Sequence, residues 1–279
     1  MQFFNYNGKL YKEDECVISV NSRGLRFGDG LYETMKSKDA KLFFPEDHFN
    51  RLVNGMEVLG FKIPAHFSAD KLEQQVYNLL KKNNHQKIAR IRFTVLRGDG
   101  GLYDDINNIP NYLIQSWSLA DDIGQLNSNG LVLGIYKEVK KSCDILSKLK
   151  HNNFLPYVMA AGFAKQEKWN DAIVLNTSDR ICDTTITNIF IVKDEIVYTP
   201  SLAQGCIAGI MRKHILQQLT VNNIEVIENE MSIPDLMDAD EVFLSNSIYN
   251  IRWVQNIGEK KYGNSFTQKI YSILAPTIL

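Results

Sequence analysis

The chain has 279 residues, of which 44% are hydrophobic and 10% aromatic, enough to bury a core in one or two domains. Its 31 lysines and arginines against 32 acidic residues leave a formal net charge of -1, so no excess charge attracts it to nucleic acid or to an anionic membrane. This composition excludes a disordered or fibrous protein and favours an enzyme that acts on a small molecule.

The cysteines and the N-terminus indicate a reducing compartment. Cys16, Cys143, Cys182 and Cys206 form no C-x-x-C pair and have no histidine at zinc-ligand spacing, so we expect reduced thiols and no metal site. The first residues lack the basic and apolar regions of a signal peptide, and no long apolar run follows. We therefore expect a soluble cytoplasmic protein, in which the sequon at 176–178 is a turn.

The first half of the chain predicts two helices and two long strands after an opening of short apolar runs. A helical pattern begins at Pro45, and a second one spans 68–82 with Ser68 as its cap. Strands are predicted over 89–96 and 112–119, and the loop 98–105 separates them.

The segment 120–129 is polar and without periodicity, which is typical of a linker. It predicts an N-terminal domain over 1–119 and a C-terminal domain over 130–279. Elements of the second domain follow from apolar periodicity: strands over 131–136, 172–175, 188–192, 196–198, 225–227 and 241–245, and helices over 153–168, from about 209, over 233–237 and over 265–274. The mixture predicts an α/β or α+β fold in both halves.

Lys150 and Asp183 are the residues with the clearest chemistry. A lysine amine can hold the aldehyde of pyridoxal 5'-phosphate as a Schiff base, and a carboxylate opposite the pyridine nitrogen keeps that nitrogen protonated. Lys150 begins the string Lys-His-Asn-Asn-Phe, and Asp183 lies five residues before Asn188-Ile189-Phe190. Together the two strings indicate a pyridoxal phosphate site.

Over nearly its whole length the chain resembles the class IV aminotransferases of fold type IV, a family with D-amino acid and branched-chain aminotransferases and aminodeoxychorismate lyases. Lys150 and Asn153 repeat the spacing of the family's Schiff-base lysine and a following asparagine. Asp183 stands where the family has a glutamate, so the carboxylate that meets the ring nitrogen is one methylene shorter here. The resemblance implies a two-domain fold with the active site between the domains.

Further residues match positions that hold the cofactor in this family. Arg51 resembles the phosphate-binding arginine, because a guanidinium can bind two phosphate oxygens at once. Ile210 and Met211, in Gly-Ile-Met-Arg, resemble a turn whose backbone N–H groups receive the phosphate at a helix start. The resemblance also implies a phosphate-binding hydroxyl at Ser247 and an apolar contact with the ring at Ile207.

Two strings resemble the substrate side of the family's site. Phe-Gly-Asp-Gly-Leu-Tyr-Glu ends with Tyr32 and Glu33, which repeat the aminotransferase version of this string. Arg97, before Gly98, is similar to an arginine that faces the substrate carboxylate. Tyr32 and Arg97 are therefore the predicted substrate residues.

The resemblance leaves three functions open. The first is an aminotransferase acting on a small amino acid and a 2-keto acid, with Lys150 as its general base. The second is an aminodeoxychorismate lyase that forms 4-aminobenzoate and pyruvate, which Lys150-His151 and Gly-Ile-Met-Arg favour. The third is a protein that binds pyridoxal phosphate without turnover, because Asp183 replaces glutamate. The family borrows a loop of the site from a second subunit, which implies a homodimer.

Overall fold

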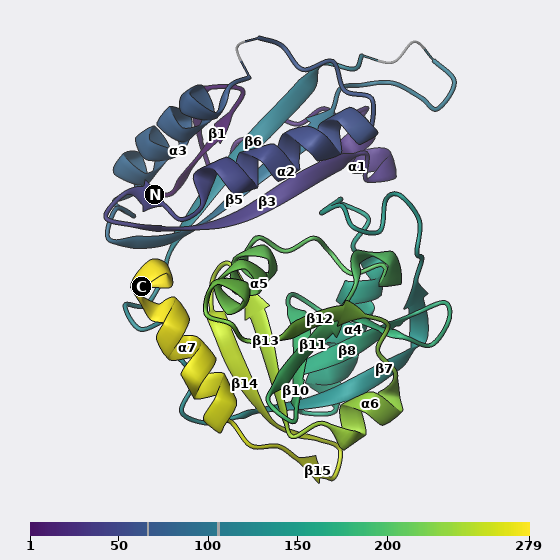
Figure 1. Cartoon of the computed structure of the whole chain (residues 1–279). Coiled ribbons are helices and arrows are strands. Elements are labelled where there is room, and N and C mark those ends of the chain that lie inside the picture. The colour runs from purple at the N-terminus through teal and green to yellow at the C-terminus, as the bar shows by residue number, and fades with distance from the viewer. Residues whose placement is uncertain (66, 105–106) are drawn as a thin grey trace. The chain divides into compact units, whose positions relative to one another are not determined.

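The computed structural model describes residues 1–65, 67–104 and 107–279, which divide into two compact units (Figure 1). The first unit comprises Met1–Ile123 and Lys150–Asn153, and the second comprises Gly124–Leu149 and Phe154–Leu279. The division falls inside the polar segment 120–129. Asp105, the end of the predicted 98–105 loop, lies outside the described residues.

The segment Lys150–Asn153 departs from the predicted domain boundaries, since we expected it inside the C-terminal part 130–279. Backbone pairing explains its place in the first unit. The amide of Tyr32 donates to the carbonyl of Lys150 at 2.8 Å, and the amide of Asn152 donates to the carbonyl of Gly30 at 3.0 Å. These bonds attach the segment to the beginning of a long strand.

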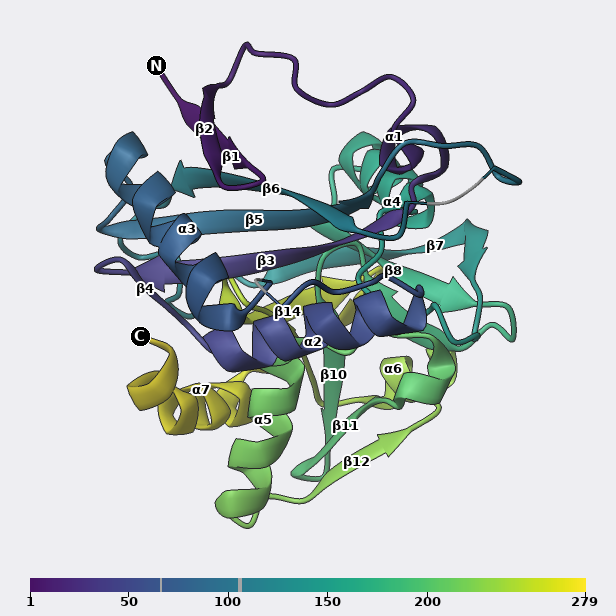
Figure 2. The same cartoon turned by 90° about the horizontal axis from the view of Figure 1, so that it is seen from above.

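The first unit is built on an antiparallel sheet with the order β2-β1-β6-β5-β3-β4. Its strands are β1 (Phe3–Tyr6), β2 (Lys9–Lys12), β3 (Gly30–Lys38), β4 (Lys41–Leu42), β5 (Ile88–Arg97) and β6 (Pro110–Ser118). Its helices are α1 (Arg23–Phe27), α2 (Pro45–Val58) and α3 (Ala69–Asn83). Helices α2 and α3 lie on one face of the sheet (Figure 2).

Apolar side chains of α2 and of the sheet form the core of this unit. Phe93 is fully buried in β5 and meets Phe49 and Phe67 edge to face, at centroid distances of 6.3 Å. Helix α2 begins at Pro45, as predicted, because proline is preorganised for the first turn. Ser68 precedes α3, also as predicted, but its side chain makes no capping bond.

The second unit contains a mixed sheet with the order β12-β11-β10-β13-β14-β7-β8-β9, and β15 pairs with β14. Its strands are β7 (Leu131–Lys141), β8 (Asp171–Asn176), β9 (Ile181–Thr184), β10 (Asn188–Lys193), β11 (Ile196–Pro200), β12 (Val226–Asn229), β13 (Glu241–Asn246), β14 (Asn250–Ile257) and β15 (Lys260–Lys261). Its helical segments are α4 (Leu155–Gln166), the 3-10 turn η1 (Leu202–Gln204), α5 (Ile210–Val221), α6 (Ile233–Asp238) and α7 (Ser265–Ile278).

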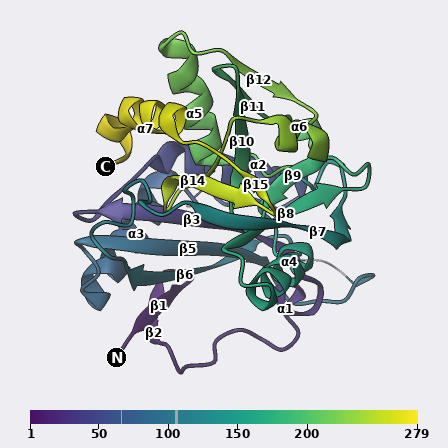
Figure 3. The ribbon, with the colours of Figure 1, turned by 90° about the horizontal axis from the view of Figure 1, so that it is seen from below.

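Two apolar clusters hold helices against this sheet. Helix α4 packs on β7 and β8 through Tyr157, Ala160 and Ala164 (Figure 3). Helix α6 contributes Leu236 to a separate cluster with side chains of β8, β10, β13 and β14. Helices α5 and α7 pack against β13. None of the described helices is long and apolar enough to cross a membrane.

Every predicted helix and strand overlaps an element of the structure, but the structure also contains elements that were not predicted. Helix α5 begins at Ile210, and α6 follows Ser232, whose side chain and that of Asp235 form a capping box. The strands β2, β3, β4, β9, β14 and β15 and the helix α1 were not predicted. Strand β9 has four residues, Ile-Cys-Asp-Thr, which are too few to show a period.

Candidate active site

The candidate Schiff-base lysine lies beside a buried tyrosine in the first unit. The Nζ atom of Lys150 is 4.6 Å from the centroid of the Tyr32 ring, and the Cζ atom of Arg92 is 3.8 Å from the same centroid. Burial raises the pKa of Tyr32 to about 12, although Arg92 opposes this shift. The Tyr32 hydroxyl therefore remains protonated at neutral pH, and the Tyr32 ring contacts the side chains of Lys150 and Arg92.

Glu33, the next residue of β3, faces the opposite side of the strand and binds two side chains of α2. It accepts from Arg51 at 2.8 Å (Nε to Oε1) and 2.5 Å (Nη2 to Oε2), and its Oε2 is 2.7 Å from Nδ1 of His48. His48 and Arg51 are three residues apart, so both lie on one face of the helix.

The charges in this cluster follow from its burial. Burial alone would raise the pKa of Glu33, but Arg51 and His48 lower that pKa to about 2. Burial lowers the pKa of His48, so its ring is neutral at neutral pH and its Nδ1–H donates to the carboxylate. The guanidinium of Arg51, our predicted phosphate ligand, is thus oriented by a two-point bond to Glu33.

Arg97 is buried and is engaged at all three of its nitrogens by protein acceptors. Its Nε donates to both oxygens of Asp29, at 3.0 and 2.9 Å, its Nη1 to Asn108 at 2.5 Å and its Nη2 to the carbonyl of Leu59 at 2.5 Å. Its Cζ also lies 4.1 Å from the ring centroid of Phe61. Each guanidinium nitrogen of Arg97 thus has a protein acceptor, and its contact with a substrate carboxylate stays a prediction.

The second unit holds Asp183 in β9, where only 2% of its surface is exposed. Its Oδ2 accepts from Tyr157 Oη at 2.8 Å, from the Ile207 amide at 3.0 Å and from Lys141 Nζ at 3.2 Å, and its Oδ1 accepts from Asn188 Nδ2 at 2.9 Å. Four hydrogen-bond donors thus satisfy the acceptor atoms of this buried carboxylate and fix its orientation. Asp183 thus lies in a strand and binds the predicted ring-contact residue Ile207.

The N-cap residue of α5 is Gly209, which has no side chain, so the first amides of the helix are not satisfied by a capping side chain. The side chains of Ile210 and Met211 are buried, and what this helix start offers a ligand is backbone N–H groups. A Cβ atom at position 209 would come within 1.9 Å of Asn188 Oδ1. Glycine is therefore required for the helix start to approach the asparagine that holds Asp183.

The end of β13 and the turn after it carry the predicted hydroxyl ligand. Ser247 is half-buried in a turn in which Asn246 Oδ1 accepts from the amides of Ile248 (3.0 Å) and Tyr249 (2.8 Å). Ser245, two residues earlier, is 1% exposed, and its Oγ has no hydrogen-bond partner. Ser245 pairs directly with residue 188 of β10, so its unsatisfied hydroxyl lies on the same face of the sheet as the Asn188 side chain.

Several residues of these clusters were missed by the sequence analysis. His48 had a usable signal, because it is three residues before Arg51 on a predicted helix. Lys141, Tyr157 and Arg92 had none, since their contacts are formed by strand pairing and by the packing of α4.

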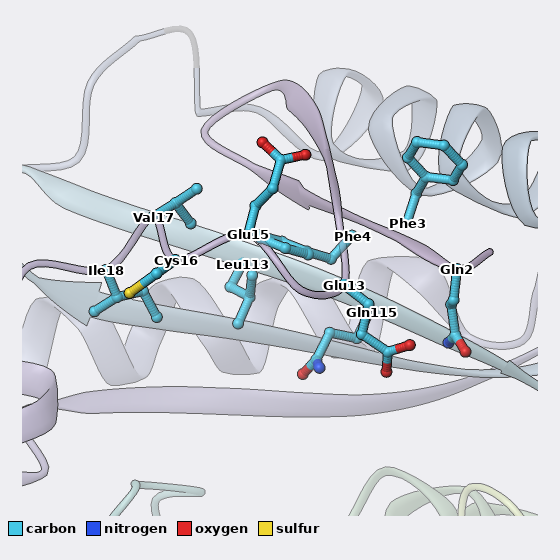
Figure 4. A pocket seen from close by; sticks show the side chains of 10 residues that line it. All are labelled: Gln2, Phe3, Phe4, Glu13, Glu15, Cys16, Val17, Ile18, Leu113 and Gln115. Atoms are coloured by element: carbon cyan, nitrogen blue, oxygen red, sulfur yellow. The ribbon is translucent and has the colours of Figure 1, made fainter.

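A cavity of about 250 Å³ lies apart from every predicted site residue (Figure 4). It is lined by β1, by β6 and by the segment 13–18, including Phe4, Val17 and Leu113. Among the residues that the structure describes, no group of three or more His, Cys, Asp or Glu side chains is arranged to hold a metal ion.

Residues 30–257 match the family model for class IV amino-transferases. An aminodeoxychorismate lyase of Vibrio harveyi is 28% identical over 242 residues, which cover 86% of this chain and 87% of the relative. A D-alanine aminotransferase of Bacillus licheniformis is 24% identical, with coverage of 98% and 96%.

Solved structures share the fold. A branched-chain aminotransferase of Thermoproteus uzoniensis superposes with a TM-score of 0.87 at 22% identity, over 99% of this chain and 95% of that one. A branched-chain aminotransferase of Escherichia coli gives a TM-score of 0.85 at 22% identity, over 97% and 92%. A further branched-chain aminotransferase, crystallised with pyridoxamine 5'-phosphate, gives a TM-score of 0.86 at 20% identity, over 99% and 94%. These matches confirm the predicted fold class.

The chain belongs to the class IV aminotransferase family, whose enzymes depend on pyridoxal 5'-phosphate. Its own residues fit that cofactor. The first unit contains a lysine amine beside Tyr32, and the second unit, described by itself, contains a buried carboxylate with four donors and an uncapped helix start with a close-approach glycine. The family relationship replaces the third of our functional hypotheses, a binding protein without turnover, with an enzyme.

Proposed function

We propose that this protein is an aminotransferase that moves an amino group between a small amino acid and a 2-keto acid. The observation that carries the proposal is the Tyr32-Glu33 pair of β3. Tyr32 contacts the amine of Lys150, and Glu33 binds Arg51 and His48. Both residues that match the aminotransferase form of this string therefore contact proposed site residues or their neighbours.

Each proposed cofactor ligand has its own part. Lys150 would form the covalent link, Asp183 would be the partner of the ring nitrogen, and Ile207 would pack on the ring. The amides at the start of α5, with Arg51 and Ser247, would bind the phosphate. When bound, pyridoxal phosphate supplies an electrophilic aldehyde and a ring that withdraws electrons from the substrate.

The protein's part in the reaction is to bind and to move protons. Once released from its covalent link, the Nζ amine of Lys150 would act as the general base for the proton on the substrate carbon that bears the amine, and then as the acid that returns it. Tyr32, protonated at neutral pH, is a hydrogen-bond donor for the substrate carboxylate. Arg97 enters this role only if a substrate displaces Asp29 or Asn108 from its guanidinium.

A second candidate function is an aminodeoxychorismate lyase. The 28% identity to the Vibrio harveyi lyase favours it, together with the strings at Lys150-His151 and Gly209-Ile210-Met211-Arg212. The same lysine and the same buried carboxylate would serve this reaction, which releases pyruvate instead of exchanging an amino group.

We also propose that the enzyme is a cytoplasmic homodimer. Helix α4 exposes three apolar side chains, Leu155, Val158 and Met159, at 73%, 56% and 53% of their surfaces. Such a stripe is typical of an interface with a second copy. The four cysteines, which are scattered along the sequence without a C-x-x-C pair, suit a reducing cytoplasm. Light scattering coupled to gel filtration gives the molar mass directly, and a monomer would contradict the dimer.

The decisive experiment is a visible absorbance spectrum of the purified protein with pyridoxal phosphate, before and after addition of D-alanine, D-glutamate, L-leucine or aminodeoxychorismate. We expect a band of lysine-bound cofactor that an amino acid converts to pyridoxamine phosphate. Lys150→Ala should lack that band, and Lys148→Ala, two residues away and exposed, should keep it. Pyruvate release from aminodeoxychorismate alone would identify the lyase, and no band would refute both functions.

A further inference from the structure

Lys141, the last residue of β7, is a buried lysine outside every role assigned above. Only 7% of its surface is exposed, and its Nζ donates to Asp183 Oδ2 at 3.2 Å, to the carbonyl of Ser147 at 3.4 Å and to the carbonyl of Gly205. The same Nζ lies 4.9 Å from the ring centroid of Tyr157, whose hydroxyl also donates to Asp183.

A buried ammonium is costly unless an anion and further acceptors compensate for the lost water. Asp183 is that anion, and the two carbonyls are the further acceptors. The titratable side chains of Tyr157, Cys182 and Cys206 also interact with Asp183. Burial raises the pKa of both thiols, that of Cys206 to about 12, so both are uncharged at neutral pH. Lys141 forms the ion pair with Asp183, at 3.2 Å.

We propose that Lys141 is a positioning residue that neutralises Asp183 and thereby sets how strongly the carboxylate and the cofactor's ring nitrogen together retain a proton. This inference rests on the proposed function, in which Asp183 is the partner of that nitrogen. With Lys141 present, the ammonium of Lys141 and the carboxylate of Asp183 have no net charge as a pair. A proton on the cofactor's ring nitrogen would then add one positive charge next to these buried side chains. Without Lys141, one proton shared by the carboxylate and the ring nitrogen gives a neutral group, which burial favours.

Lys141 also connects three segments that carry proposed cofactor ligands. The first contains Asp183 itself. The second contains Ser147, three residues before Lys150, and the third contains Gly205, two residues before Ile207. The amide of Ala208 donates to the carbonyl of Lys148 at 3.2 Å, which joins the same two segments. Gly205 has a φ of +85°, and a Cβ atom there would come within 2.5 Å of the carbonyl oxygen of Ser142, so this turn depends on glycine as well as on Lys141.

The test is a pH titration of the ring nitrogen in the assembled enzyme. Apoprotein is reconstituted with pyridoxal phosphate labelled with ¹⁵N in the ring, and the ¹⁵N chemical shift is followed in wild type, Lys141→Met and Lys141→Gln. The neighbouring Lys140→Met is the matched control, because Lys140 pairs with an exposed aspartate, Asp179, and not with Asp183. Glutamine keeps N–H donors for the carbonyls but removes the charge, so it decides the question if the methionine variant does not fold.

We expect the nitrogen of Lys141→Met and Lys141→Gln to lose its proton about one pH unit or more above wild type, the order expected for removal of a nearby charge. Lys140→Met should titrate like wild type. Identical titrations in wild type and in a folded charge-removing variant would overturn the role of Lys141 and leave the proposed function intact. Failure of the wild type to bind the cofactor would instead refute the proposed function.

Discussion

Two buried carboxylates, Glu33 in the first unit and Asp183 in the second, are held by different sets of donors. Glu33 meets a guanidinium and a neutral imidazole, whereas Asp183 meets an ammonium, a phenol, an amide side chain and a backbone amide. Around each carboxylate, several donors replace the water that burial removes. Single substitutions at these positions should therefore act on charge and on stability together.

Glu33 predicts a loss of stability in acid. The pKa of Glu33 in the folded protein is about 2, against an ordinary value of 4.5. Its ionised carboxylate therefore stabilises the fold fully above pH 4.5, and this stabilisation is lost as the pH falls toward 2. The shift corresponds to a contribution to the free energy of unfolding on the order of 3 kcal/mol. We expect Glu33→Gln to be less stable than wild type near neutral pH, with a gap that narrows in acid. Chemical unfolding at several pH values measures this gap, and a gap independent of pH would contradict the prediction.

Arg97 either stabilises the fold or binds the substrate carboxylate, and a substitution can distinguish these two roles. A lysine in its place cannot meet Asp29, Asn108 and the Leu59 carbonyl at once, because it lacks the planar fork of arginine. We expect Arg97→Lys to lower the free energy of unfolding by about 3 kcal/mol. The exposed Arg26→Lys is the control and should leave stability unchanged. An unchanged melting temperature with a raised KM for the amino acid would instead assign Arg97 to the substrate.

At the scale of elements, one strand and one helix start organise the two clusters. Alternation along β3 sends Tyr32 and Glu33 to opposite faces, so neighbouring residues serve Lys150 and α2 separately. The start of α5 approaches Asn188 because position 209 has no side chain. Backbone geometry, more than any single side chain, thus places the proposed phosphate site.

Gly209→Ala tests this close approach. Its backbone angles, φ -66° and ψ 138°, suit alanine, so the effect comes from contact alone. The added Cβ would lie 1.9 Å from Asn188 Oδ1 and would displace the side chain that donates to Asp183. We expect a loss of about 1–3 kcal/mol in stability, as for overpacking, and weaker binding of pyridoxal phosphate by fluorescence titration.

The matched control is Gly263→Ala, where the nearest atom to an added Cβ is Glu241 Oε1 at 3.7 Å, an ordinary van der Waals distance. This change should leave stability and cofactor binding unchanged. Equal effects of the two substitutions would show that contact with Asn188 does not matter.

At the scale of the whole molecule, the four cysteines report the integrity of the fold. Cys16 and Cys143 are exposed, whereas Cys182 and Cys206 are buried next to Asp183 and carry thiols of raised pKa. The thiolate is the reactive form of cysteine. Burial therefore protects Cys182 and Cys206 in two ways: it blocks access by reagents, and it keeps both thiols protonated.

Thiol labelling follows from this division. We expect a chromogenic thiol reagent to modify Cys16 and Cys143 rapidly in the native protein, and Cys182 and Cys206 only after denaturation. Mass spectrometry of the labelled peptides identifies the sites. Rapid labelling of Cys182 or Cys206 in the native protein would contradict the buried environment of Asp183.

The sequence by itself determined the fold class, most regular elements and the family, because periodic apolar residues and the strings around Lys150, Asp183 and Gly209 are local in the chain. The tertiary structure decided which charges meet. Lys141 and Asp183 are 42 residues apart, and Glu33 and Arg51 are 18 apart, so only sheet register and helix packing join them. It also gave Arg97 its internal partners and placed Lys150–Asn153 with the first unit, since backbone pairing with β3 is a long-range contact that no local pattern encodes.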